Sequence, residues 1–317
     1  MLRNDAQKNK PAAGLNGLIR AEALRLGFSF CGIAKNQPLE ELRPFYTAFI
    51  QRGGQAGLEY LKTHLEKRLH PELLLEKSKS VVAVMMNYYP QQVIPETDNF
   101  ILAKYAYGGD YHLIMREQLG KLIKYMNSLT NDIFTRAFVD SGPMLEKAWA
   151  QRCGVGWQGK NTLIIHPEAG SFFFIGILLT SLELEPDIPG KDHCGSCEKC
   201  INACPTGALD APYQLNISRC ISYLTIESKE EIPGEFRGKL KDHIYGCDIC
   251  QDVCPFNRFA IPGTLPEFIP SASLTQLRKK EWLALDETTF DRVFENSPVK
   301  RAGYPRLMRN IRAASQH

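Results

Sequence analysis

The sequence predicts a mixed fold of the α+β or α/β class, followed by a smaller cysteine-rich domain. Apolar strands and amphipathic helices alternate as far as residue 185, and eight of the ten cysteines lie between Cys194 and Cys254. From about residue 266 the chain returns to a helical pattern. The 317 residues are enough for two ordinary domains. The expected division is a disordered segment over 1–14, an α/β domain over 15–185, a cysteine domain over 186–265 and a basic helical segment over 266–317.

Hydrophobic periodicity predicts the individual elements of the first domain. Helices are expected over 15–26, 44–65 (interrupted at Gly53 and Gly54), 111–129 and 145–152, and strands over 28–34, 80–89 and 134–139. Residues 162–166 and 171–180 are expected to form a hairpin around Pro-Glu-Ala-Gly. The second strand of this hairpin is too apolar for a sheet edge, so we expect it to run through the centre of the sheet.

The cysteines form two related motifs. Cys194, Cys197, Cys200 and Cys204 follow the pattern C-x2-C-x2-C-x3-C-P, and after Cys220 a second group, Cys247, Cys250 and Cys254, ends in C-x3-C-P. The first pattern is the iron–sulfur motif of bacterial ferredoxins, in which the cysteine before proline binds the other cluster. We therefore expect two [4Fe–4S] clusters, one held by Cys194, Cys197, Cys200 and Cys254, the other by Cys204, Cys220, Cys247 and Cys250. Two zinc sites are the alternative, because C-x2-C pairs also bind zinc.

Composition and the N-terminal residues indicate the compartment in which the protein is expected to work. The net charge of +3 and the pI of about 8.3 say little about partners. Iron–sulfur assembly and free thiols favour a reducing compartment, and the N-terminal residues have neither an apolar signal core nor a twin-arginine pair. We therefore expect a soluble, cytoplasmic protein without a membrane span. No G-x-G-x-x-G or P-loop motif indicates a nucleotide site.

Several residues of the first domain are candidates for a site. Asp140 ends an apolar strand, where carboxylates often face a ligand crevice, although it could equally cap the next helix or brace its turn. The loop over 154–162 combines three glycines with Lys160, Asn161 and Thr162, and could cradle a ligand or simply connect two elements. His112 and His166 are expected to be partly buried histidines with satisfied hydrogen bonds.

Taken together, these residues resemble the epoxyqueuosine reductase family, cobalamin-dependent iron–sulfur enzymes of tRNA modification. The similarity extends over about 15–312 and rests on both cysteine motifs, on YAYGGDYH at 105–112 and on FVDSGPMLEKAWAQRCGVGWQGKNTLI at 138–164. SYLTIE at 222–227 and IYGCDIC at 244–250 add further matches.

The resemblance implies a nitroreductase-like cobalamin-binding domain followed by the ferredoxin domain. It implies reduction of epoxyqueuosine to queuosine at the wobble position of tRNA, with cob(I)alamin supplied with electrons by the two clusters. The family's proton donor falls on Asp140, for which a water-free pocket is expected. Its corrin contacts fall on Arg68, Asp140, Lys160, Asn161, Thr162, Ser222 and Asp248. The expected partners are the tRNA and an external electron donor of the ferredoxin or flavodoxin type, and the protein is expected to be a monomer.

The chain departs from the family pattern in one respect. Longer relatives carry a C-terminal helical-repeat extension that helps to bind tRNA, whereas this sequence ends at His317. The basic residues of the last helical stretch, Lys300, Arg301, Arg306, Arg309 and Arg312, are therefore expected to contact the tRNA backbone. The competing interpretations are a corrinoid reductive dehalogenase, a plain electron-transfer protein, and a tRNA-binding chaperone with structural clusters.

Overall fold

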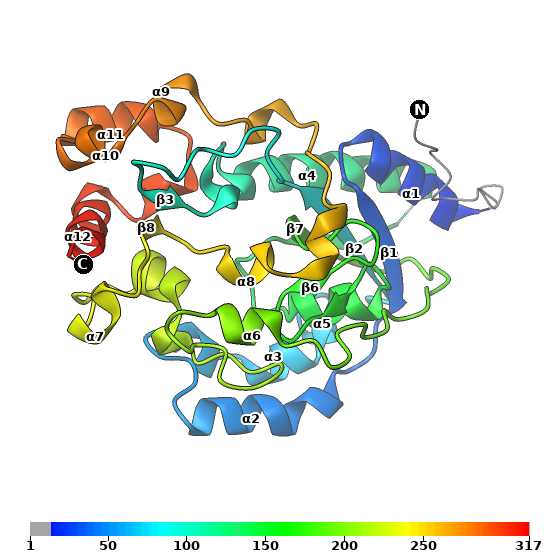
Figure 1. Ribbon diagram of the computed structural model, residues 1–317. Coiled ribbons are helices and arrows are strands. Elements are labelled where there is room, and N and C mark those ends of the chain that lie inside the picture. Colours follow the sequence, from blue (N-terminus) through cyan, green and yellow to red (C-terminus); the bar gives the residue numbers. More distant parts are fainter. Residues whose placement is uncertain (1–13, 131, 317) are drawn as a thin grey trace.

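The centre of the first domain is a four-stranded antiparallel sheet in the order β1-β2-β7-β4 (Figure 1). The computed structural model describes residues 14–130 and 132–316. The strands are β1 (Phe30–Lys35), β2 (Ser80–Asn87), β4 (Thr135–Phe138) and β7 (Phe173–Thr180). Both central strands, β2 and β7, are almost wholly buried. The prediction that the apolar run over 171–180 crosses the sheet centre is confirmed. Because this sheet is antiparallel, the fold is α+β.

Helices cover both faces of the sheet, and the alternation of side chains along β2 shows why. Val82, Val84 and Met86 face α1 (Leu15–Arg25) and α4 (Tyr111–Leu129), whose apolar residues complete one core. Val81, Ala83 and Met85 point the other way, into a core shared with α5 (Glu146–Arg152). At β1 the layers come very close, since a Cβ on Gly32 would lie 1.9 Å from the carbonyl oxygen of Cys153.

Most predicted elements of the first domain are present with shifted ends, but the predicted hairpin over 162–180 is wrong. Strand β6 (Ile164–Ile165) pairs with β5 (Trp157–Gln158), not with β7, and only a single bridge joins His166 to Gly170. Strand β7 pairs with β2 along its whole length and with β4 over 177–180, and its remaining edge is not paired with β6. The helix expected over 44–65 is interrupted at Gly53 and Gly54 as predicted, since α2 (Arg43–Gln51) ends just before them. Its second half is a 3-10 turn over Glu59–Lys62 instead of an α-helix, and α3 (Leu65–Leu69) begins where the prediction ended. The disorder expected over 1–14 lies outside the described residues except for Gly14.

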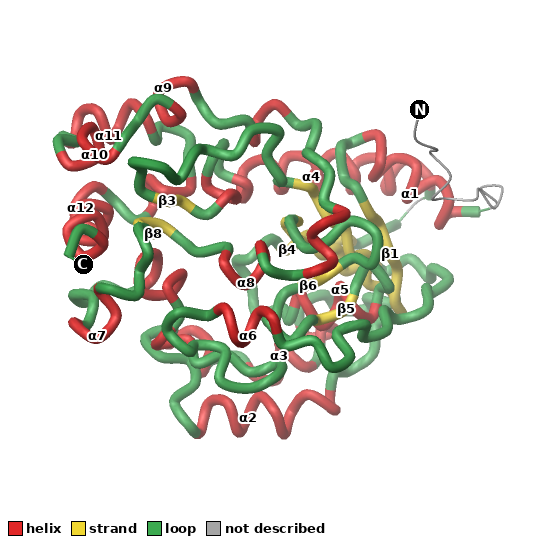
Figure 2. The backbone as a smooth tube through the Cα atoms, viewed as in Figure 1, coloured by secondary structure: helices red, strands yellow, loops and turns green. Residues whose placement is uncertain are grey.

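The cysteine region is mostly loop, as Figure 2 shows, with only short helices and one short strand. These are α6 (Lys199–Ala203), α7 (Gly234–Arg237), β8 (His243–Tyr245) and α8 (Ile249–Asp252). The C-terminal part contains α9 (Ala272–Thr275), α10 (Lys279–Leu283), α11 (Glu287–Val293) and α12 (Tyr304–Ala314). Over 14–130 and 132–316, no helix is both long and apolar enough to span a membrane.

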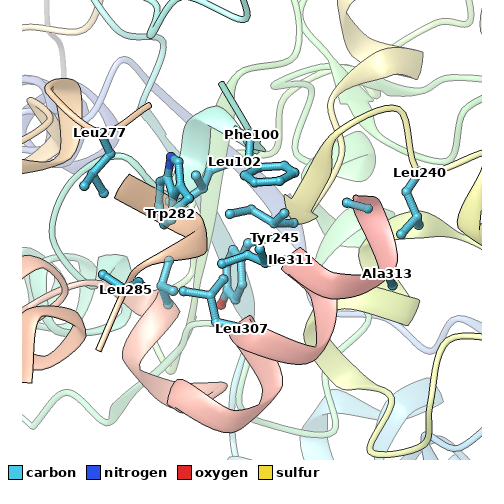
Figure 3. Close-up of a cluster of buried hydrophobic side chains, with 14 of the residues drawn as sticks. Phe100, Leu102, Leu240, Tyr245, Leu277, Trp282, Leu285, Leu307, Ile311 and Ala313 are labelled. Atoms are coloured by element: carbon cyan, nitrogen blue, oxygen red, sulfur yellow. The ribbon is translucent and has the colours of Figure 1, made fainter. Parts of the chain in front are cut away.

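A third core crosses the predicted domain boundaries (Figure 3). Strand β3 (Ile101–Leu102) leaves the first domain and pairs in parallel with β8. Phe100 and Leu102 then pack with Trp282 and with residues of α12 such as Ile311. The boundaries at 185 and 265 stay a prediction, and residues around 94–107 pack with the C-terminal part.

The expectation that all the basic residues near the C-terminus contact tRNA is wrong for Arg309, which is buried in α12. Arg309 is only 6% exposed, and its guanidinium donates to the carbonyls of Leu224 (2.7 Å) and Ser228 (2.8 Å). Its neighbour Asn310 donates to Thr225 and Ile244. Arg309 is therefore not available to phosphate, because α12 uses it to hold the chain that follows Ser222.

Candidate active site between the sheet and the cysteine loops

A cavity of about 650 Å³ lies where the sheet domain meets the cysteine loops. Its walls are largely aromatic on the sheet side, with Tyr88, Tyr111 and Phe174 among the lining residues. The opposite wall comes from the cysteine region and from the segment that leads into α12. A space of this size with mixed aromatic and polar walls is typical of a ligand site.

The two groups of cysteines occupy different cavities. Cys204, Cys220, Cys247 and Cys250 line the large cavity, whereas Cys194, Cys197, Cys200 and Cys254 line a smaller one of about 40 Å³. Helices α6 and α8, which lie within the two motifs, pack against each other. This places Cys254 with the first group and Cys204 with the second. The arrangement supports the crossover predicted from the Cys-Pro motifs.

The environment of these thiols suits metal-bound thiolates. Burial raises the pKa of Cys247 to about 12 and that of Cys250 well above its usual value, with neighbouring cysteines adding to the effect. Sulfurs held together in this way need a cation to become thiolates, and cluster iron would supply it. Cys204 differs: although burial works to raise its pKa, hydrogen bonds lower it, including one from the amide of Ala208 at 3.3 Å.

Asp140 lies at the wall of the large cavity, directly after β4. Its Oδ2 accepts a hydrogen bond of 2.6 Å from the hydroxyl of Tyr111, and its backbone amide donates to Oε1 of Glu146 at 2.7 Å. The capping alternative does not hold, because Leu145 is the N-cap of α5 and no side chain caps it. The Asp140 side chain is 65% exposed, so the protein alone does not form the expected water-free pocket around it.

A histidine and an arginine flank this carboxylate. His112, next to Tyr111 at the start of α4, is only 6% exposed, and its Nε2 lies 3.8 Å from Oδ2 of Asp140. Arg301 donates to Nε2 of His112 at 3.0 Å, and Nδ1 lies 2.8 Å from Oδ1 of Asp110. The expectation of a buried, hydrogen-bonded histidine is met. The hydrogen bond between Arg301 and His112 connects the C-terminal segment to the start of α4, and both residues line the large cavity.

The structure separates the residues that the resemblance implied as corrin contacts. Five of them line the large cavity: Asp140, Asn161, Thr162, Ser222 and Asp248. Lys160 lines the small cavity instead, together with the first cysteine group. Arg68 lines neither, because its guanidinium is turned toward the backbone and donates to the carbonyls of Tyr60 (3.0 Å) and Thr63 (3.2 Å). It thus supports Tyr60, which does line the large cavity.

Sequence reasoning missed several residues of the wall. Tyr111 and Lys147 line the large cavity, and Lys147 donates to the carbonyl of Thr162 at 2.9 Å. Both stand within stretches that the sequence analysis singled out, but their side-chain directions depend on packing. Arg306, which was expected to contact tRNA, lines the same cavity. A sheet domain, two groups of four cysteines and a cavity touching one of those groups define an iron–sulfur oxidoreductase.

Comparison with known proteins gives the particular family. One family model, described as "4Fe-4S double cluster binding domain", matches residues 193–257, and another, described as "Epoxyqueuosine reductase QueG, DUF1730", matches residues 68–141. The epoxyqueuosine reductase of Cellulophaga algicola is 45% identical over 294 residues, which are 93% of this chain and 96% of that protein. The enzyme of Escherichia coli is 38% identical over 301 residues, covering 93% and 79%.

Solved structures agree with this result. An epoxyqueuosine reductase in complex with a tRNA-Tyr epoxyqueuosine-modified tRNA stem loop superposes with a TM-score of 0.87 at 35% identity, covering 94% of this chain and 80% of that one. The Bacillus subtilis enzyme, in a form whose catalytic loop is swung out of the active site, gives a TM-score of 0.86 at 34% identity, covering 94% and 80%. The chain belongs to the epoxyqueuosine reductase family.

Proposed function

We propose that the chain reduces epoxyqueuosine to queuosine at the wobble position of tRNA, with cobalamin in the large cavity and Asp140 as the proton donor. One observation carries the proposal: Asp140 and the second group of cysteines, Cys204, Cys220, Cys247 and Cys250, line the same cavity. A substrate bound there would meet a source of electrons on one side and a carboxyl group on the other.

The chemistry requires both. Converting the epoxide to an alkene breaks the two bonds to oxygen and consumes two electrons and two protons, with the oxygen leaving as water. A bound cobalamin would supply the cobalt centre that transfers the electrons to the substrate. Asp140 would protonate the departing oxygen, held in place for this by Tyr111. The carboxyl becomes shielded from water only when cofactor and substrate cover it.

The cavity suits a corrin with amide side chains. The aromatic residues Tyr88, Phe173 and Phe174 contribute apolar surface to the cavity wall, and the polar groups of Asn161, Thr162 and Ser222 line the same cavity. Asp248 serves a different purpose, because its Oδ2 accepts from the amide of Lys104 at 2.7 Å. We assign the corrin contacts to the first three polar residues, and we give Arg68 and Lys160 supporting roles outside this cavity.

Electrons would enter at the first cluster. Three of its cysteines, Cys194, Cys197 and Cys200, are interspersed with residues that are exposed to solvent, namely Gly195, Ser196, Glu198 and Lys199. A small external donor of the ferredoxin or flavodoxin type would approach there, with the protein acting as a monomer. The reductive dehalogenase and the plain electron-transfer protein are not favoured, because the relatives reported above are epoxyqueuosine reductases.

The test is incubation of reconstituted, anaerobically reduced protein with epoxyqueuosine-containing tRNA, with and without added cobalamin, followed by nucleoside mass spectrometry. Queuosine formed only with cobalamin supports the proposal. Conversion without any bound cobalamin, measured by its absorption spectrum, would remove the cofactor from it. A failure to convert with both clusters and cobalamin loaded would overturn the assigned reaction.

A further inference from the structure

The backbone at Asp140 is held in an unfavourable conformation. Its φ of +49° lies in the left-handed region, which Asp adopts more readily than most residues with a Cβ atom, although still at a cost. The turn follows β4 directly, and the Asp140 side chain extends into the large cavity rather than folding back on the turn. Such a conformation persists only where surrounding contacts impose it.

Glu146 provides the contact that fixes this backbone. Its Oε1 accepts the hydrogen bond from the amide of Asp140 at 2.7 Å, closing the loop between β4 and α5. Glu146 opens α5, which is anchored in the core by Trp149 and Ala150. The hydrogen bond therefore ties the Asp140 amide to a helix that is anchored in the core.

The other contacts of this loop do not replace that bond. Arg116 donates to the hydroxyl of Ser141 at 2.9 Å, and the amide of Met144 donates to the carbonyl of Gly142 at 2.8 Å. Neither contact reaches the backbone of Asp140. Tyr111 orients the carboxylate, but it binds the side chain and not the main chain.

The position of Glu146 disfavours its charged carboxylate, which is not the case for an acidic residue that faces solvent in the first turn of a helix. Desolvation by the surrounding protein, followed by the nearby Asp140, raises the pKa of the Glu146 carboxyl to about 8. An acid chosen only to favour the helix start would do better pointing into water, where its charge is not opposed. Helix stabilisation therefore does not explain why the Glu146 side chain points toward Asp140, whereas the hydrogen bond to the Asp140 amide does.

We propose that Glu146 is a positioning residue, which holds the Asp140 loop in the conformation that presents the Asp140 carboxyl to the substrate. This inference rests on the proposed function of Asp140 as proton donor. Glu146 does not touch the substrate, and its effect passes through the backbone amide of Asp140. Without its acceptor oxygen, the turn would lose the hydrogen bond that ties the Asp140 amide to α5, and the carboxyl would leave its position.

Two variants separate the acceptor from the charge. Glu146→Ala removes the acceptor, whereas Glu146→Gln keeps an oxygen that can accept from the same amide. For Glu146→Ala we expect kcat to fall on the order of 10²-fold, the effect of misplacing a catalytic group, with the KM for tRNA unchanged. For Glu146→Gln we expect kcat within a few-fold of the parent. Glu41→Ala is the matched control, because it removes a carboxylate that binds Arg152 at the other end of α5.

Hydrogen exchange provides a readout independent of turnover. In holoenzyme with both clusters and cobalamin, the amide of Asp140 should lose protection in Glu146→Ala, but keep it in Glu146→Gln and in Glu41→Ala. Cluster and cobalamin content should be the same in all of them. Unchanged protection of Asp140 in Glu146→Ala would overturn the inference, as would a Gln variant as slow as the Ala variant.

The double variant Asp140→Asn with Glu146→Ala distinguishes the two proposals. If Glu146 acts through Asp140, adding Glu146→Ala to Asp140→Asn should lower kcat little further. A full additional loss would overturn the positioning role. If Asp140→Asn alone has the parent rate, the proposed function of Asp140 fails, whereas the exchange of its amide still reports whether Glu146 holds the loop.

Discussion

The hydroxyl of Tyr111 lies 2.6 Å from Oδ2 of Asp140 and donates a hydrogen bond to it. The Tyr111 ring is itself fixed, because it stacks on Phe174 of β7 with 4.2 Å between ring centroids and 4° between planes. A residue at the start of α4 and a residue after β4 thus meet over the central strand. The carboxylate is oriented by a group whose own position is set by the sheet.

Replacing the proton donor is the first prediction. Asp140→Asn keeps the size of the side chain but removes its acidic proton, so we expect turnover to fall roughly 10²- to 10⁴-fold. Nucleoside mass spectrometry measures the rate, and the absorption spectrum of bound cobalamin should stay as in the parent. A variant that converts substrate at nearly the parent rate would make Asp140 a residue of the turn only.

Tyr111→Phe should have a smaller effect. The ring keeps its stacking on Phe174, but the carboxylate loses a hydrogen bond of the charged type, whose net contribution is about 1.5–3 kcal/mol. We therefore expect kcat to fall by about 10- to 100-fold, with KM unchanged. Tyr125→Phe, on the same helix and outside the cavity wall, is the control. Equal rates for both variants would contradict the orienting role.

The crossover of the clusters can be tested with the two cysteines that precede proline. Cys254→Ala should disturb the cluster of Cys194, Cys197 and Cys200, and Cys204→Ala the cluster at the large cavity. Electron paramagnetic resonance of each reduced variant should retain the signal of the unaffected cluster, and cobalamin in the cavity should respond only to Cys204→Ala. If Cys254→Ala instead altered the cobalamin spectrum while Cys204→Ala did not, each cysteine would serve its own local cluster.

The basic residues near the C-terminus should divide into two classes. Arg301 and Arg306 line the large cavity, and Arg306, which also donates to the carbonyl of Ile226, is only partly buried, unlike Arg309. Arg301→Gln and Arg306→Gln should therefore each weaken tRNA binding and reduce the salt slope by about 1. Arg312→Gln is the control, since this exposed arginine is not among the residues of the cavity wall. A salt slope unchanged in all three would exclude this surface from tRNA binding.

Arg309→Met tests the structural class. It leaves the carbonyls of Leu224 and Ser228 without their donor, and we expect a loss of about 3 kcal/mol in the free energy of unfolding, since each buried unsatisfied acceptor costs about 1–3 kcal/mol. Thermal unfolding of the holoprotein measures it, with Arg312→Met as the matched exposed variant. Parent stability in Arg309→Met, combined with a reduced salt slope, would restore Arg309 to the tRNA surface.

His166 should make stability depend on pH. Burial lowers the pKa of its imidazole to about 4, its ring stacks on Phe30 at 3.7 Å, and its Nδ1 accepts from the amide of Glu168. Because the folded pKa lies below the unfolded value of about 6.5, folding favours the neutral ring. Its contribution is complete above pH 6.5 and is lost as pH falls toward 4. His166→Gln should show a weaker pH dependence than the parent between these values, and identical pH profiles of thermal unfolding would contradict the assignment.

The periodic and spaced features of the chain were open to prediction from the sequence. The bounds of α4 at Tyr111 and Leu129 agree with the predicted helix, because an amphipathic stripe records the burial of one face. The cysteine spacing predicted a double-cluster domain, since the geometry of a cluster constrains residues only a few positions apart. The apolar character of β7 predicted its central place in the sheet because both of its faces are covered.

Tertiary structure alone decided the partners of these elements. Nothing local to these strands indicates that β6 pairs with β5, that β7 pairs with β2 and β4, or that β3 leaves the first domain to pair with β8. Nothing in the composition of α12 records that Arg309 is buried, because its carbonyl partners lie 81 and 85 positions earlier in the chain. Sequence patterns indicate which face of a helix or strand is buried, and which residues a few positions apart can bind the same cluster. Contacts between distant segments depend on how the whole chain packs, and these contacts determine which residues face the cavity.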